Sequence, residues 1–118
     1  MSAPAFFLRE VELYERDVTL RLPFRFGVVT LTECPQLFVR ARIETAGGRS
    51  GWGLAAEMLA PKWFDKNLAL TNEDNFDQLR LSTKTASELY RGDRIARTAF
   101  GFFEAHYRAQ IEIGRAHV

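Results

Sequence analysis

Apolar and polar residues alternate along the first part of the chain. Val11 and Leu13 alternate with Glu10 and Glu12, and a similar alternation follows up to residue 20. A period of two places successive side chains on opposite faces of a strand. The sequence therefore predicts a strand from Leu8 to Leu20, with one buried face and one face in water.

A clearer alternation covers residues 37–44. One face would carry Leu37, Val39, Ala41 and Ile43, and the other Phe38, Arg40, Arg42 and Glu44. Residues 46–49 then read Ala-Gly-Gly-Arg, which predicts a tight turn because glycine tolerates positive φ. Ser50 to Ala56 returns as a third strand. Together these segments predict a β-hairpin.

The residues between the first two strands predict a loop. Residues 21–27 read Arg-Leu-Pro-Phe-Arg-Phe-Gly, and Pro23 and Gly27 should interrupt strand pairing. This loop is unusual because it carries two Phe and two Arg residues. Pro35 predicts a bend or an edge position in the second strand.

Helical spacing replaces the alternation in the second half of the chain. Thr71 is suited to cap a helix, with Asp74 three residues further on, and Gly92 would end it. One face of this helix would carry Phe76, Leu79, Thr83, Ala86 and Tyr90. Asp93 could cap the next helix.

The second helix should have a wide apolar face. Ile95, Ala99, Phe102 and His106 would form one stripe, and Ala96, Phe100, Phe103 and Tyr107 an adjacent one. A stripe of this width predicts burial against more than one surface. Strands followed by helices favour an α+β fold, here a three-stranded antiparallel meander followed by a helical segment.

Composition narrows the class of protein. The 118 residues are 47% hydrophobic, which suits one folded domain with its own core. Sixteen basic and fifteen acidic residues give a net charge of +1, so neither nucleic acid nor an anionic membrane is an expected partner. One cysteine, Cys34, and an N-terminus without a secretory pattern predict a reducing, cytoplasmic location.

No complete catalytic set is evident in the sequence. Glu10 and Glu12 share a strand face, but a solvated face explains them better than a carboxylate pair. Neither His106 nor His117 has metal-ligand spacing, and Cys34 lacks a neighbouring histidine or helix start. Helix-dipole compensation accounts for the acidic helix start at Glu73, Asp74 and Asp77. We therefore predict no catalytic residue and no metal ligand in this chain.

Large apolar side chains stand where loops are expected. They are Phe24 and Phe26 in the first segment, and Met58, Trp63 and Phe64 in the segment after the third strand. Loops normally favour polar residues. Two interpretations remain open: these side chains fold back onto the domain's own core, or they form a patch that a partner surface covers.

Two cations lie among these apolar residues. Arg25 and Lys62 are expected to be solvated. If either faces a pocket, its charge would suit a carboxylate.

The order of elements, the Phe- and Arg-rich loop and the strand Gly51-Trp52-Gly53-Leu54-Ala55-Ala56-Glu57 resemble a known family. The chain is similar over residues 5–110 to the N-terminal capping domain of the enolase superfamily, in its mandelate racemase and muconate lactonizing branch. The resemblance implies that residues 1–110 form a cap over a C-terminal TIM-like barrel, which this sequence does not contain.

In that family two capping loops complete the substrate pocket. Carried over by position, the first loop is 22–28 and the second is 56–63. The substrate-binding residues that the resemblance implies are Phe24, Arg25, Phe26, Met58, Lys62 and Trp63. The cap would select a small carboxylate substrate and exclude water.

The chemistry implied by the resemblance belongs to the parent enzyme. A racemase, dehydratase or cycloisomerase of this family abstracts the proton α to a carboxylate, with Mg²⁺ stabilising the enolate and a lysine or histidine acting as base. Those groups lie on the barrel, so this fragment should be inactive. The intact protein would form a homo-oligomer.

The end of the chain reads differently from the rest. Residues 111–118 include Ile-Gly-Arg-Ala-His-Val, which does not continue the apolar pattern of the helix. We expect this segment to be a non-native tail, with the true protein continuing past about residue 110. Two alternatives to an enzyme cap remain: a stand-alone ligand-binding or assembly module of α+β fold, and a small dimeric enzyme of cystatin-like shape.

Overall fold

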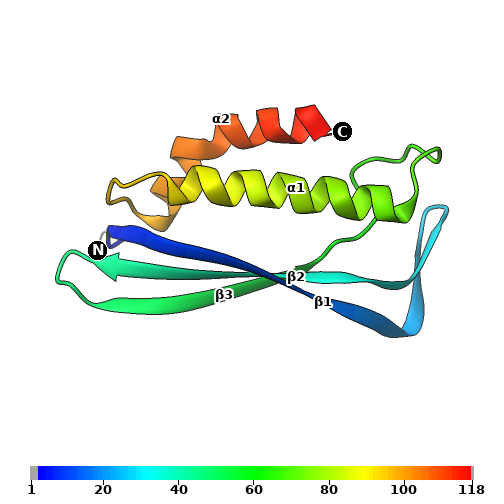
Figure 1. The fold of residues 1–118 in the computed structure, drawn as a ribbon, viewed down its shortest axis with the longest axis horizontal. Helices are drawn as coiled ribbons and strands as arrows, with labels where there is room; N and C mark the ends of the chain where they lie inside the picture. Colours follow the sequence, from blue (N-terminus) through cyan, green and yellow to red (C-terminus); the bar gives the residue numbers. More distant parts are fainter. Residues whose placement is uncertain (1–2, 118) are drawn as a thin grey trace.

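A computed structural model describes the backbone of residues 3–117 and the side chains of residues 3–112. The elements are β1 (Phe6–Phe26), β2 (Val29–Thr45), β3 (Ser50–Met58), α1 (Asn72–Arg91) and α2 (Ala99–His117). The strands form one antiparallel sheet in the order β1-β2-β3. Helix α1 covers one face of the sheet and α2 lies on α1, farther from the sheet (Figure 1). The predicted α+β meander is confirmed.

The first strand is longer than its sequence pattern indicated. The prediction of a loop over residues 21–27 is wrong, because Phe24 and Phe26 pair with Leu31 and Val29 and extend β1 to the hairpin turn. The pairing shifts between Thr19 and Phe24, so the segment around Pro23 bulges out of the ladder. An edge strand tolerates such a proline because it removes no ladder hydrogen bond there.

Turns at the two ends of β2 set the register of the sheet. Gly27 has φ of 56° in the first turn, and Gly48 has φ of 84° in the predicted turn after β2. Glycine adopts this left-handed region without the steric cost of a Cβ. Pro35 lies opposite Asp17, beyond the last β2–β3 pair, and its carbonyl accepts a hydrogen bond from the Leu59 amide at 3.0 Å.

The hydrophobic core is small and lies between α1 and the β2 strand. Its buried members are Leu31, Cys34, Leu37, Leu59 and Phe76. Leu13, Leu20, Phe26, Val39, Met58 and Leu79 pack partly buried against them. Hence the helix face of the sheet is closed mainly toward the hairpin end, where α1 begins.

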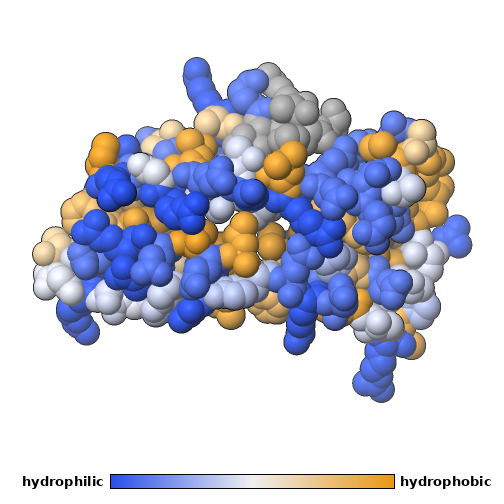
Figure 2. Space-filling model, in the orientation of Figure 1, coloured by the Kyte–Doolittle hydropathy of each residue, from blue (hydrophilic) through white to orange (hydrophobic). Residues whose placement is uncertain are grey.

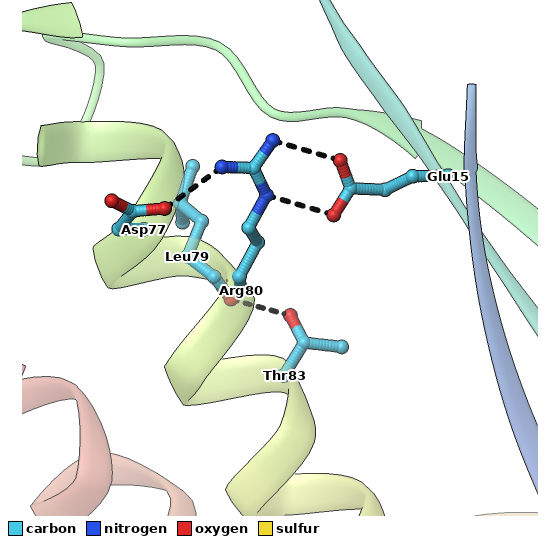
Figure 3. Close-up of polar contacts among 5 residues, drawn as sticks. All are labelled: Glu15, Asp77, Leu79, Arg80 and Thr83. Atoms are coloured by element: carbon cyan, nitrogen blue, oxygen red, sulfur yellow. Dashed lines mark hydrogen bonds and ion pairs between the residues drawn. The ribbon is translucent and has the colours of Figure 1, made fainter. Parts of the chain in front are cut away.

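Helix α1 starts and docks as its sequence indicates. The Thr71 hydroxyl accepts a hydrogen bond from the Asp74 amide, and the Asp74 carboxylate accepts one from the Thr71 amide, which completes a capping box. Arg80 then joins the helix to the sheet: its guanidinium donates two hydrogen bonds to Glu15 of β1, at 2.8 and 2.9 Å, and one to Asp77 at 2.8 Å (Figure 3).

The second helix begins later than predicted. Asp93 does not cap it; the Thr98 hydroxyl does, by accepting a hydrogen bond from the Gly101 amide at 2.9 Å. Asp93 instead accepts hydrogen bonds from the Ile95 amide, from Arg97 and from His106. The sequence could not separate these roles, since an aspartate favours both a cap and a turn.

Only one of the two predicted stripes on α2 is partly buried. Phe102 is 4% exposed and stacks on Phe6, whereas Phe100, Phe103 and Tyr107 are 68%, 47% and 49% exposed. The prediction of burial against more than one surface is therefore wrong within this chain. The backbone stays helical through His117, so it does not change course at residue 111. The side chain of His117 lies outside the described residues, and the non-native origin of the tail stays a prediction.

Candidate functional site

Two segments that are far apart in sequence meet at one end of the molecule. The β1–β2 hairpin rises beside the loop between β3 and α1 (Figure 1). The ring centroids of Phe24 and Phe26 lie 5.6 Å apart, and those of Phe26 and Trp63 lie 5.4 Å apart with an edge-to-face tilt of 71°. We call Phe24, Phe26 and Trp63 the aromatic cluster. It joins residues from both of the segments that the sequence singled out.

The aromatic cluster is only partly covered. Phe24 is 56% exposed and Trp63 is 68% exposed, whereas Phe26 packs against the core. Apolar surface gathers at this end of the space-filling view (Figure 2). The two interpretations left open by the sequence therefore divide among residues: Phe26 and Met58 contribute to the domain's own packing, while Phe24 and Trp63 remain available to something else.

A hollow of about 170 Å³ lies beside the cluster. Its lining is mostly apolar and comprises Phe26, Gly27, Val28, Val29, Lys62, Trp63, Lys66 and Leu68. Lys66 is exposed at this site and supplies a cation near the apolar walls. An apolar hollow with a cation nearby suits a small organic anion such as a carboxylate.

Lys62 shapes the loop beneath the hollow. It is 7% exposed and has φ of 62°, a left-handed conformation that is uncommon for a residue with a side chain. Its ammonium donates hydrogen bonds to the Leu70 carbonyl at 2.7 Å and to the Asn75 side-chain oxygen at 2.8 Å. The expectation of a solvated Lys62 is wrong, because the loop folds over its side chain and these two acceptors replace water.

Arg25 and Met58 lie apart from the hollow. Strand alternation places Arg25 on the opposite side of β1 from Phe24 and Phe26, and it is exposed as expected. Met58 packs against the core at the end of β3. The second loop begins at Leu59 rather than at residue 56, because β3 continues through Met58.

Val28, Lys66 and Leu68 were not singled out as binding residues. Val28 and Leu68 are 77% and 72% exposed, and all three line the hollow. Val28 and Leu68 carried the same signal as Phe24, since each is an apolar residue in a connecting segment. Lys66 carried no such signal, because an exposed lysine in a loop is ordinary.

The other acidic candidates have structural partners. Glu10 forms an ion pair with Arg42 at 2.9 Å, and Glu12 forms one with Arg40 at 3.0 Å, across β1 and β2. A cross-strand ionic ladder thus occupies the sheet face that the helices leave open. Cys34 is buried within the core, and burial raises the pKa of its thiol, partly offset by a hydrogen bond from the Leu59 backbone. A buried thiol of raised pKa is a poor nucleophile.

Metal ligation finds no support in the part of the chain that the structure describes. No three His, Cys, Asp or Glu side chains there lie close enough to hold an ion. His106 instead contacts Asp93 at 2.7 Å and packs on the Tyr90 ring at 4.8 Å. The residues that the structure describes therefore do not fit a magnesium site.

Neither helix, over the residues described, combines the length and the apolar character needed to cross a membrane. Comparisons with known proteins add no family: no family model matches the chain, and no curated protein or solved structure matches it.

Proposed function

We propose that this chain is the substrate-capping lid of a magnesium-dependent enzyme of the enolase superfamily, which acts on a small carboxylate by α-proton abstraction. The observation that carries the proposal is the meeting of the β1–β2 hairpin with the β3–α1 loop. Their contact leaves Phe24 and Trp63 exposed beside an apolar hollow. A lid needs such a surface because it must cover a substrate and exclude water.

The total surface of the chain supports a missing partner. The accessible surface is 8346 Å², whereas a compact monomer of this mass exposes about 6,500 Å². The radius of gyration is 16.6 Å, compared with about 13–14 Å for a compact domain of this length. The excess area is large enough for an extensive contact with a second domain.

The roles of the site residues follow from their positions. The exposed side chains of Phe24 and Trp63 would contact the apolar part of the substrate, Phe26 would support them from the core side, and Lys66 would attract the carboxylate. Lys62 would hold the loop in place, because its ammonium already has two protein acceptors. In this proposal the lid itself would contribute no base and would be inactive alone. We propose that a C-terminal barrel, absent from this sequence, holds the base and the Mg²⁺, and that the parent enzyme is cytoplasmic and oligomeric.

The first test uses the parent protein, obtained by following the reading frame past residue 110. With Mg²⁺ present, exchange of the α-proton of mandelate or lactate is measured by NMR in deuterated water. Trp63→Ala should raise KM about tenfold, since the aromatic contact that Trp63 would make with the bound substrate is lost. Trp52→Ala is the matched control: Trp52 lies on β3 and does not line the hollow, so KM should not change. Equal effects of the two variants would contradict the lid.

The second test separates the lid from a stand-alone ligand-binding module. A Trp52→Phe variant of this chain leaves Trp63 as its single tryptophan. Its fluorescence is followed during titration with mandelate and lactate. A lid without its barrel should give no saturable change, because half of the pocket is missing. A saturable change in the isolated chain would favour the module and overturn the lid.

A further inference from the structure

The two edges of the sheet are protected to different degrees. The β1 edge carries alternating charges and Pro23, and its first residue is occupied: Phe6 and Arg97 exchange backbone hydrogen bonds of 2.9 and 3.0 Å. Charged residues, proline and a covering segment all oppose pairing with another chain. The β1 edge is therefore protected against pairing with a strand of another chain.

The β3 edge has none of these protections. Residues 50–56 read Ser-Gly-Trp-Gly-Leu-Ala-Ala, without a charge or a proline, and every residue from 50 to 57 is exposed. Its pairing with β2 is regular throughout, without a bulge. Leu54 is 67% exposed and Trp52 is 43% exposed. A flat, uncharged and apolar edge strand is a template for an additional strand.

Backbone hydrogen bonding at the two ends of β3 fixes which residues face outward. The Thr45 amide donates to the Arg49 carbonyl at 2.8 Å, and the Leu59 amide donates to the Pro35 carbonyl at 3.0 Å. In an antiparallel ladder, residue pairs that exchange two backbone hydrogen bonds alternate with pairs that exchange none. The odd-numbered residues of β3 therefore bond to β2, and Ser50, Trp52, Leu54 and Ala56 direct their amides and carbonyls away from the sheet.

Charges flank this strand symmetrically. Arg49 precedes it and Glu57 lies near its end, each four residues from Gly53. Positions 49 and 57 are both odd-numbered and lie on the helix side of the sheet. Within the part of the chain that the structure describes, neither side chain forms an ion pair; a Glu57 oxygen accepts only the Met58 amide, at 3.2 Å.

We propose that two copies of this chain pair through β3, antiparallel about a two-fold axis at Gly53, to form one continuous six-stranded sheet. Arg49 of each copy then lies opposite Glu57 of the other, so both unpaired charges are satisfied. Trp52 lies opposite Leu54, which buries the two exposed apolar side chains on the open face. The outward amides and carbonyls form about eight hydrogen bonds across the axis.

Other registers lose these features together. Sliding one copy by one residue, which moves the axis between two residues, places the outward-facing amides and carbonyls of one copy opposite residues of the other copy that bond to β2. Sliding one copy by two residues, which moves the axis to Trp52 or Leu54, restores the bonding but separates Arg49 from Glu57. Charge complementarity therefore selects a second copy of this chain in one register. This interface does not depend on the proposed lid function.

Charge reversal gives the first test, with sedimentation velocity used to measure the dimer dissociation constant. Arg49→Glu places like charges opposite each other twice in the dimer, and Glu57→Arg does the same with the opposite sign. Each single variant should weaken dimerisation about tenfold. The double variant should restore it, because the pairs form again in reverse. Circular dichroism checks that each variant folds.

Cysteine cross-linking gives the second test. Gly53→Cys places two thiols opposite each other at a non-hydrogen-bonded position, where Cα atoms are about 4.5 Å apart and a disulfide can form. Gly51→Cys is the matched control, because its copies lie four residues apart along the paired strands. Neither glycine has an atom within 4 Å of an added Cβ, so both variants should fold.

The proposal requires a disulfide-linked dimer from Gly53→Cys and none from Gly51→Cys under air oxidation. A sedimentation profile that stays monomeric up to the solubility limit would overturn it. Equal cross-linking of both cysteine variants would also overturn it. The same holds if the charge-reversed double variant dimerises no more tightly than the single variants, since either result indicates non-specific association.

Discussion

Asn75 accepts two hydrogen bonds from Lys62, one from its backbone amide at 3.1 Å and one from its ammonium at 2.8 Å. Asn75 is fully buried in the first turn of α1, and its own amide group donates to Gln78 at 2.9 Å. A single side chain thus secures a loop residue in a left-handed conformation. The loop that presents Trp63 is fixed to the helix start through this contact.

Asn75→Ala should lower the free energy of unfolding by about 2–3 kcal/mol, because it leaves two buried donors of Lys62 without an acceptor. Urea unfolding followed by circular dichroism measures the change. Asn72→Ala is the control: Asn72 is exposed at the start of α1, so its replacement should change stability by less than about 0.5 kcal/mol. A loss no larger than that of Asn72→Ala would show that the hydrogen bonds between Asn75 and Lys62 add nothing measurable to stability, since alanine is the better helix former at both positions.

The carboxyl group of Asp93 should make the stability of the fold depend on pH in the acidic range. Burial opposes its ionisation, but hydrogen bonds from the Ile95 amide, His106 and Arg97 together hold the pKa of its carboxyl below the ordinary value. A lowered folded-state pKa contributes stability that is present above the unfolded pKa of about 3.9 and is lost as pH falls through the folded value.

Asp93→Asn tests this assignment. At neutral pH the variant should be less stable by about 1–3 kcal/mol, since hydrogen bonds to a buried carboxylate are lost or weakened. The difference between the two proteins should shrink below about pH 4, where the wild-type carboxylate also becomes protonated. Thermal unfolding at a series of pH values gives the comparison. If the stability difference between the two proteins stays constant down to pH 2, the loss comes from altered packing or hydrogen-bond geometry and not from the charge of the carboxylate.

The Arg80–Glu15 contact should contribute modestly to docking of α1 on β1. Hydrogen bonds from Arg80 to Glu15, and secondarily to Asp77, raise the pKa of Arg80 further above its ordinary value. Their side chains are about one third exposed, so solvent screens the pair. A double-mutant cycle with Arg80→Met and Glu15→Gln should give a coupling energy of about 0.5–1 kcal/mol that falls at high salt. A coupling of zero would mean that the apolar contacts of Phe76 dock the helix alone.

The thiol of Cys34 should react slowly while the protein is folded. It is 4% exposed, and burial raises its pKa. The rate of reaction with a disulfide reagent such as DTNB at pH 7 should be at least about tenfold lower than in urea. Rapid labelling of the folded protein would reveal local opening of the core near the hairpin.

Local patterns predicted the parts of the fold that depend on neighbouring residues. The turn at Gly48 follows from two adjacent glycines, and the capping box follows from Thr71 and Asp74, three residues apart. The strand course of residues 21–26 could not be foreseen in this way. It depends on pairing with Val29 and Leu31 across the hairpin, which outweighs the interrupting effect of Pro23.

The candidate site was predictable only in outline. Exposed apolar residues in connecting segments indicated Phe24 and Trp63, but their meeting through Phe26 joins positions 26 and 63, which no local pattern links. The burial of Lys62 depends on Asn75, thirteen residues away. Charge alone suggested a solvated lysine, because the acceptors that replace water are supplied by tertiary structure.

Adjacent residues of the β3–α1 loop serve separate purposes. Lys62 faces inward and is held by α1, whereas Trp63 faces outward and is 68% exposed. Position 63 can therefore accept many different side chains without unfolding the loop, whereas position 62 cannot. A scaffold with this division could acquire new ligand preferences by single substitutions, since the residue that would be exchanged carries little of the stability of the fold.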